Sequence, residues 1–113
     1  MEQNRLNGYH IMWLFVMFDM PTETKEQRKS SARFRKNLKK SGFSMLQYSV
    51  YIRHCASGEA TDTYIKRIKR MIEAEGKVSI LSVTDKQFGN MINYWGHKTT
   101  IPLQKEVQQL SIF

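Results

Sequence analysis

IMWLFVMFDMP, residues 11–21, contains an uninterrupted apolar run that stops at Asp19. A continuous apolar run of this length is typical of a central β-strand that is covered on both faces. Asp19 is the first polar residue after the run, and Pro21 then breaks the strand. A carboxylate at a strand end is held rigidly and faces solvent, so Asp19 is the first candidate for a functional residue.

A basic helix is predicted directly after this strand, over residues 24–41. Thr24 and Gln27 have the spacing of a capping box, which marks the start of a helix. At 100° per residue, Phe34 and Leu38 fall on one side of this helix. We therefore expect these two side chains to anchor the helix to the sheet, with the Lys and Arg side chains on its flanks.

The remaining elements follow from periodicity and from turn residues. Residues 46–53 alternate between apolar and polar, which predicts one half-buried strand. We expect a loop over 55–60, a second amphipathic helix over 62–75 and a β-rich strand over 77–84. Residues 88–95 are interpreted as a short further strand.

This order predicts an α+β fold, a ferredoxin-like βαββαβ sandwich with an additional C-terminal strand. The fold needs two antiparallel strands between its helices, so either residues 46–53 bend and contain both, or residues 53–57 supply the second. The expected organisation is an N-terminal extension over 1–10, one domain over 11–95, and a tail over 96–113.

Composition favours a nucleic-acid partner. The chain has 113 residues with 18 Lys and Arg against 10 Asp and Glu, a formal net charge of +8. An excess of positive charge is informative about binding partners rather than about the fold. Nucleic acid is the first candidate partner and an anionic membrane surface is the second. The single cysteine, Cys55, excludes an intrachain disulfide and fits a reducing compartment. The apolar run is too short to span a bilayer and does not resemble a signal peptide, so we expect a cytoplasmic protein.

Several short motifs together resemble one family. FVMFDMPT closes the first strand, ARFRK lies in the basic helix, and QYSVY over 47–51 and VTDKQF over 83–88 follow. The chain is similar to the small universal subunit of CRISPR spacer acquisition, the Cas2 family, of the branch found in type II systems. The resemblance covers about residues 11–95.

This resemblance implies a ferredoxin-like homodimer that lies between two dimers of the CRISPR integrase subunit and captures double-stranded DNA for insertion into the array. It also implies a metal-dependent endonuclease that cuts single-stranded RNA or double-stranded DNA. In that account Asp19 is the catalytic residue and binds Mg²⁺ across the dimer axis. The C-terminal region of family members adds a strand to a partner, which makes Leu110, Ile112 and Phe113 candidates for partner binding.

The chemistry of Asp19 alone leaves two interpretations open. Mg²⁺ keeps several waters and is held by one or two carboxylates plus substrate phosphates. One Asp per subunit is too few for a robust site, whereas two copies of Asp19 facing each other across a dimer axis would suffice for one weakly held ion. Alternatively, an Asp before Met-Pro satisfies backbone N–H groups in a turn.

The basic helix supplies the candidate phosphate contacts, because Arg binds phosphate by two hydrogen bonds and Lys as a point charge. Such contacts position a duplex without reading its bases. The alternative is a solvated helix face. The candidate nucleic-acid-binding residues are Arg28, Lys29, Arg33, Arg35, Lys36, Lys39 and Lys40.

Two other functions were weighed. A free-standing, toxin-like metal-dependent endoribonuclease of the same fold is the alternative to an acquisition subunit, and it has no support beyond the fold. An RNA-recognition motif stacks bases on paired sheet aromatics. Its glycine-aromatic signature is absent, and alternation places Tyr48 and Tyr51 on opposite faces of one strand.

Overall fold

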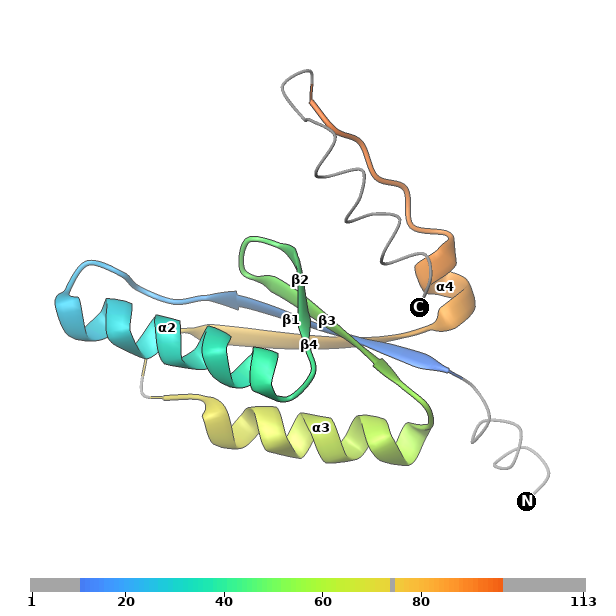
Figure 1. Cartoon of the computed structure of the whole chain (residues 1–113), viewed down its shortest axis with the longest axis horizontal. Helices are drawn as coiled ribbons and strands as arrows, with labels where there is room; N and C mark the ends of the chain where they lie inside the picture. The colour runs from blue at the N-terminus through green and yellow to red at the C-terminus, as the bar shows by residue number, and fades with distance from the viewer. Residues whose placement is uncertain (1–10, 74, 97–113) are drawn as a thin grey trace.

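The computed structural model describes residues 11–73 and 75–96, and these form a single antiparallel sheet with helices (Figure 1). The elements in chain order are β1 Met12–Asp19, α2 Lys25–Lys40, β2 Ser44–Gln47, β3 Val50–Cys55, α3 Gly58–Met71, β4 Lys77–Thr84 and α4 Asp85–Gly89. The strand order is β2-β3-β1-β4. The predicted βαββαβ ferredoxin-like arrangement is therefore confirmed. The predicted 1–10 extension and the partner-binding candidates Leu110, Ile112 and Phe113 lie outside the described residues.

Strand β1 lies at the centre of the sheet, as its apolar run predicts. It pairs antiparallel with β3 and β4, so that Val16 is opposite Tyr51 on one side and Ile80 on the other. Leu14 and Val16 are fully buried against the helices. The second face is less completely covered than predicted, because Phe15 and Met17 are only half-buried.

Helices α2 and α3 cover the same face of the sheet (Figure 1). Phe34 and Leu38 of α2 are buried in the core with Phe18, as the periodicity predicts, and the rings of Phe18 and Phe34 meet edge to face at 4.9 Å. The capping box of α2 is present, with the Gln27 backbone N–H donating to Thr24 Oγ1 at 3.0 Å and the Thr24 N–H donating to Gln27 Oε1 at 2.9 Å. Helix α2 is thus fixed at its start and along its buried face.

The predicted single strand over 46–53 is wrong, and the first of the two alternatives is the correct one. A turn at Tyr48 and Ser49 divides it into β2 and β3. Ser49 adopts a left-handed backbone conformation with φ of 67°, and its carbonyl accepts a hydrogen bond from the Phe18 backbone N–H at 3.0 Å. A non-glycine residue adopts this conformation rarely, so the reversal depends on contacts from elsewhere in the fold.

Helix α3 begins four residues earlier than predicted. Ser57 is its N-cap and accepts a hydrogen bond from the Ala60 backbone N–H at 3.2 Å, so part of the predicted 55–60 loop is helical. The helix ends at Met71, and Ile72, which the sequence places on the apolar stripe, is exposed. Ser is a strong N-cap residue, and this local signal outweighs the apolar periodicity that suggested the later start.

The predicted strand over 88–95 is also wrong within the described residues. Thr84 and Gln87 form a second capping box, which starts the short helix α4 instead. The Trp13 indole Nε1 donates to Asp85 Oδ1 at 2.8 Å, and the Phe88 ring stacks on Trp13 with centroids 4.1 Å apart. Helix α4 therefore covers part of the sheet face that α2 and α3 leave open. None of the helices formed by the described residues has the length and apolar character required for a bilayer crossing.

Candidate nucleic-acid interface

Asp19 is the last residue of β1 and its side chain is exposed. Side chains alternate along a strand, so Asp19 shares a face with Met17 and Phe15, whereas Phe18 faces α2. The Cα partner of Asp19 on β4 is Lys77, which is also exposed. Residues opposite each other on neighbouring strands project from the same face. The strand end therefore presents one carboxylate and one ammonium group to solvent.

The backbone beside Asp19 is held by a close turn. Gly76 has φ of +113°, and a Cβ atom at this position would lie 2.9 Å from Met20 Cγ and 3.1 Å from the Asp19 carbonyl oxygen. Glycine is required here both for the conformation and for the close approach. The turn before β4 thus fixes the backbone that orients Asp19.

One chain supplies few metal ligands at this position. Among the described residues, no group of three or more His, Cys, Asp or Glu side chains is arranged to hold a metal ion. A single exposed carboxylate does not fit a resident ion. It does fit a Mg²⁺ ion that is held mainly by water and by the phosphates of a bound nucleic acid.

The three arginines predicted to contact phosphate all form hydrogen bonds to other groups of the protein. The Arg28 Nη1 atom donates to the carbonyl oxygens of Thr22 and Glu23, each at 3.0 Å. Arg35 is half-buried, and its Nη1 donates to Ser31 Oγ at 2.9 Å. The exposed Arg28 thus holds the turn after β1, whereas the half-buried Arg35 packs against the core.

Arg33 forms a two-pronged ion pair with Glu73. Its Nε donates to Glu73 Oε2 at 3.0 Å and its Nη2 donates to Oε1 at 2.8 Å. This hydrogen bonding holds the pKa of the Glu73 carboxyl below its ordinary value and raises the pKa of Arg33. Both side chains are exposed, so the contribution of the pair to stability is small.

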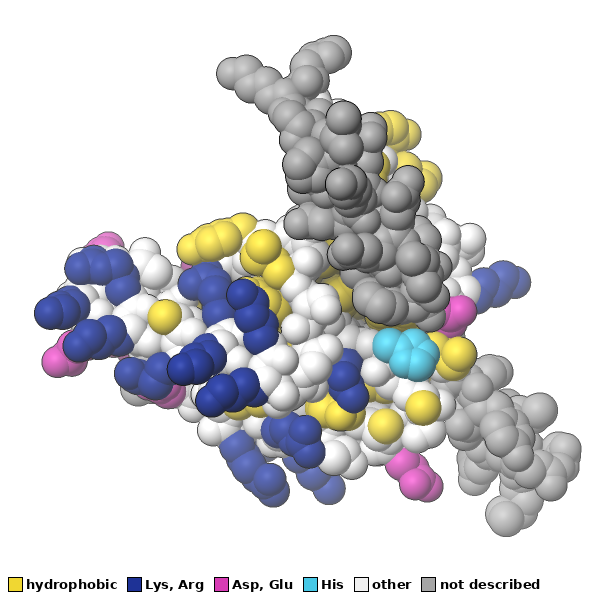
Figure 2. All heavy atoms as spheres, viewed as in Figure 1, with side chains coloured by type: hydrophobic (Ala, Val, Ile, Leu, Met, Phe, Trp, Pro, Cys, Tyr) yellow, Lys and Arg dark blue, Asp and Glu magenta, His cyan; other side chains and the backbone are white. Residues whose placement is uncertain are grey.

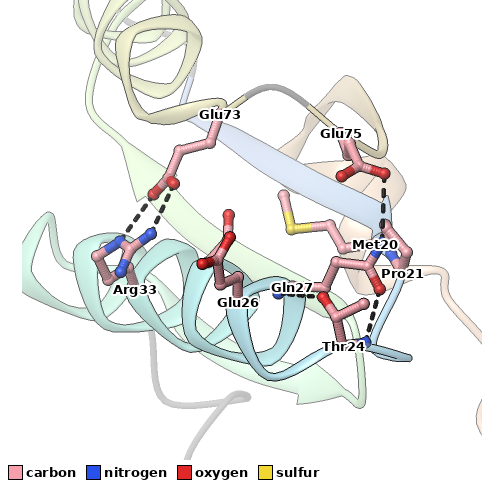
Figure 3. A pocket seen from close by; sticks show the side chains of 9 residues that line it. Met20, Pro21, Thr24, Glu26, Gln27, Arg33, Glu73 and Glu75 are labelled. Carbon is pink, nitrogen blue, oxygen red and sulfur yellow. Dashed lines mark hydrogen bonds and ion pairs between the residues drawn. The ribbon is translucent and has the colours of Figure 1, made fainter.

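The Arg33–Glu73 pair lines a pocket at the N-terminal end of α2 (Figure 3). The pocket has a volume of about 230 Å³, and Glu26 and Glu75 also line it. Gln27 Nε2 donates to Glu75 Oε2 at 3.3 Å across this space. Carboxylates thus surround the start of a helix that the sequence presents as uniformly basic.

The predicted lysines behave differently from the arginines. Their side chains are exposed and make no hydrogen bond or ion pair with other described residues. Basic side chains dominate the viewed face over α2 and α3 (Figure 2). The free α2 lysines are Lys29, Lys36, Lys39 and Lys40. They are available for phosphate contacts.

The structure does not bring Asp19 and these lysines onto one surface, because they lie on opposite sides of the sheet. The β2–β3 turn contacts both β1, through Phe18, and α2, through Arg35. Its Tyr48 is 74% exposed, and the Arg35 guanidinium carbon lies 4.4 Å from the Tyr48 ring centroid. Sequence reasoning missed both Tyr48 and Lys77. The register of β4 against β1 would have identified Lys77, but no local signal indicates the turn.

These features define a class: a small ferredoxin-like protein with a free basic helix surface and one exposed carboxylate at the end of its central strand. The family model described as CRISPR associated protein Cas2 matches residues 12–91. The chain belongs to this family, which confirms the resemblance found in the sequence.

Curated relatives support the assignment over nearly the whole chain. A protein of Flavobacterium psychrophilum is 46% identical over 109 residues, which cover 96% of this chain and 94% of the relative. A protein of Parvibaculum lavamentivorans is 47% identical over 102 residues, which cover 90% of this chain and all of the relative. Both relatives are named CRISPR-associated endoribonuclease Cas2.

Proposed function

We propose that this chain is the subunit of CRISPR spacer acquisition that binds double-stranded DNA without reading its sequence and bridges integrase dimers. The observation that carries the proposal is the set of α2 lysines without a partner among residues 11–73 and 75–96, whereas the predicted α2 arginines are engaged by other groups of the protein. Lys36, Lys39 and Lys40 are concentrated at the C-terminal end of the helix. Flexible ammonium groups follow a phosphate backbone and do not require one base sequence.

A homodimer formed through the second face of the sheet is part of this proposal. Phe15 and Met17 are half-buried on that face, and Leu81 of β4 is 49% exposed. A second copy of the chain would cover this face of the sheet. It would also supply a second carboxylate as a metal ligand beside Asp19. Asp19 lies at the edge of the same face, so a two-fold axis there would bring two carboxylates toward each other.

Integrase binding is assigned to the C-terminal region. Ile92 and Tyr94 are 74% and 91% exposed, and they lead toward the tail that holds Leu110, Ile112 and Phe113. Exposed apolar residues in a segment without strand pairing suit addition to the sheet of another protein. Deleting residues 109–113 is expected to weaken integrase binding while the fold, measured by circular dichroism, is retained.

Metal-dependent phosphodiester cleavage is the second candidate function, and the name shared by the relatives favours it. Asp19 would hold Mg²⁺, which would polarise the scissile phosphate and supply hydroxide. Lys77 would neutralise phosphate charge beside it. The alternative is that Asp19 only stabilises the turn after β1. In that case, removing its charge causes no loss of cleavage.

Spacer acquisition in cells tests the proposal and separates the two functions. Lys36→Glu, Lys39→Glu and Lys40→Glu together are expected to abolish acquisition while the dimer persists. The matched control reverses three exposed cations of α3, Lys66, Lys69 and Arg70, and is expected to retain most acquisition. Equal loss in both variants would reject the α2 surface and leave only a general effect of net charge.

Asp19→Asn then distinguishes scaffold from nuclease. Acquisition that continues with a folded Asp19→Asn dimer makes the protein a DNA-binding scaffold in this process. Acquisition that stops with an intact dimer places a carboxylate or metal step within it. Cleavage is then compared between the purified native protein and purified Asp19→Asn. This comparison controls for contaminating nuclease, because only an activity of the protein itself is lost with the Asp19 carboxylate.

A further inference from the structure

The β2–β3 turn holds an exposed aromatic ring in a fixed position. Tyr48 is 74% exposed, yet one side of its ring is occupied by the Arg35 guanidinium, with 4.4 Å between the guanidinium carbon and the ring centroid. The same guanidinium lies 5.3 Å from the centroid of the buried Phe18 ring. Arg35 is therefore packed between a core aromatic and a surface aromatic, which favours both contacts.

Two further contacts restrict Arg35 and the turn. Arg35 Nη1 donates to Ser31 Oγ at 2.9 Å, and Nη2 approaches Ser49 Oγ at 3.4 Å. The Ser49 carbonyl in turn accepts the Phe18 N–H at 3.0 Å, which ties the left-handed turn to the end of β1. An exposed ring is usually mobile, but here its support is part of the core. A pre-positioned ring loses little conformational freedom when a ligand stacks on it.

The turn also contacts both the end of β1, through Phe18, and α2, through Arg35. Val50 is the Cα partner of Met17, and the Ser49 carbonyl accepts the Phe18 backbone N–H, so the turn begins beside the end of β1. On the helix side, Lys39 is one turn after Arg35 on the same flank of α2 and is exposed. A nucleic-acid strand whose phosphates follow this flank of α2 would pass Tyr48, which packs on Arg35.

We propose that Tyr48 is a stacking platform for one unpaired base of a single-stranded nucleic acid, with the neighbouring phosphate on Lys39. Aromatic stacking combined with a cationic path is the general solution for binding single strands, because every base has a flat face. Bases inside a duplex are already stacked on each other and cannot reach the ring. The residue therefore selects single strands or unpaired ends over duplex. This inference rests on the proposed nucleic-acid binding and names the form of nucleic acid that the turn binds.

The test is binding of a single-stranded RNA of about 12 nucleotides and of a matched DNA duplex, measured in EDTA so that nothing is cut. Tyr48→Ala is expected to lower single-strand affinity by about tenfold and to leave duplex affinity unchanged. Tyr48→Phe keeps the ring and is expected to bind like the native chain. Met45→Ala removes another exposed apolar side chain, at 49%, from the adjoining strand β2 and serves as the control.

A double-mutant cycle, which combines Tyr48→Ala with an abasic site in the oligonucleotide, identifies the contact directly. Oligonucleotides with an abasic site at successive positions are bound to native and Tyr48→Ala chains. At one position the two losses are expected not to add, because they delete the same contact. Additive losses at every position, or native affinity in Tyr48→Ala, would overturn the proposal. A native chain that binds duplex but no single strand rejects the platform alone, whereas one that binds neither rejects the proposed function as well.

Discussion

Both the first and the last part of α2 contain Lys and Arg, but their electrostatic surroundings differ. Between the start and the middle of the helix, Arg33 is paired with Glu73, and Glu26 and Glu75 line the adjoining pocket. At the C-terminal end, Lys36 and Lys39 have no partner among the described residues. The difference shows that a net charge of +8 is not spread evenly along the helix. Uncompensated positive charge is therefore most concentrated at the C-terminal end, where it can attract a polyanion.

The choice between Arg and Lys follows the same division. Arg28 and Arg33 use the planar guanidinium to bind carbonyl and carboxylate oxygens within the protein. The lysines have a compact charge on a flexible stem and remain in solvent. Counting basic residues therefore overestimates the DNA-binding surface, and the two side-chain types need to be considered separately.

The largest expected effect comes from neutralising each end of α2 and comparing the results. Lys36→Gln, Lys39→Gln and Lys40→Gln together are expected to reduce the salt slope of duplex binding by about 2–3, since each lost phosphate contact removes about 1. Arg28→Gln with Arg33→Gln is expected to leave the slope nearly unchanged. Fluorescence anisotropy over a range of salt concentrations measures the salt slope of each variant. Equal slopes in the two variants would mean that the two parts of α2 do not differ in phosphate contacts.

A second way to sharpen the comparison is to strain the turn that adjoins the N-terminal end. Gly76→Ala places a Cβ against Met20 and the Asp19 carbonyl at a φ of +113°. We expect a loss of about 2 kcal/mol in the free energy of unfolding, in the range for strained backbone positions. Urea unfolding measures it. Gly58→Ala, where a Cβ meets nothing within 4 Å, is the control and should be nearly neutral.

The third prediction concerns the arginine that separates the two ends. Arg35→Met removes the hydrogen bonds to Ser31 and Ser49 and the charge over Phe18, but keeps much of the apolar stem. The expected loss is about 1.5 kcal/mol, typical for hydrogen bonds from a charged donor that is partly buried. Lys39→Met is the control at the next turn. Comparable stability of the two variants would mean that Arg35 is as dispensable as a surface lysine.

The smallest expected effect is the pH dependence of the Arg33–Glu73 pair. The pKa of Glu73 is lowered in the folded chain, chiefly by its hydrogen bond from Arg33. The stabilisation is therefore present above the ordinary Glu pKa of about 4.3 and is lost as the pH falls through the lower folded value. Glu73→Gln should flatten this acid limb slightly in thermal melts. A steeper limb in the variant would contradict the sign of the effect.

What the sequence predicted correctly depends on local interactions. The β1–α2 junction, the Thr24–Gln27 capping box and the burial of Phe34 and Leu38 all follow from spacings of a few residues. These local signals are strong because neighbouring elements agree with them. They were sufficient for the fold class and for the family.

The errors arose where distant residues decide the outcome. The Ser49 turn depends on Phe18 and Arg35, and nothing within residues 46–53 indicates it. The charge of Arg33 is paired with Glu73, which is 40 residues away in the chain, so Arg33 is less available for phosphate. The register that places Lys77 beside Asp19 likewise exists only in the folded sheet. Pairings between distant residues cannot be recognised from one sequence.

The burial of Cys55 has a practical consequence for following this surface in solution. Cys55 is the only cysteine of the chain, it is 2% exposed, and burial raises the pKa of its thiol. The native chain should therefore react slowly with maleimides, because the thiolate is the reactive form. A cysteine in place of Lys29, outside the C-terminal lysine group, would then be the single labelled position. A dye attached there would report nucleic-acid binding and subunit exchange without any other change to the protein.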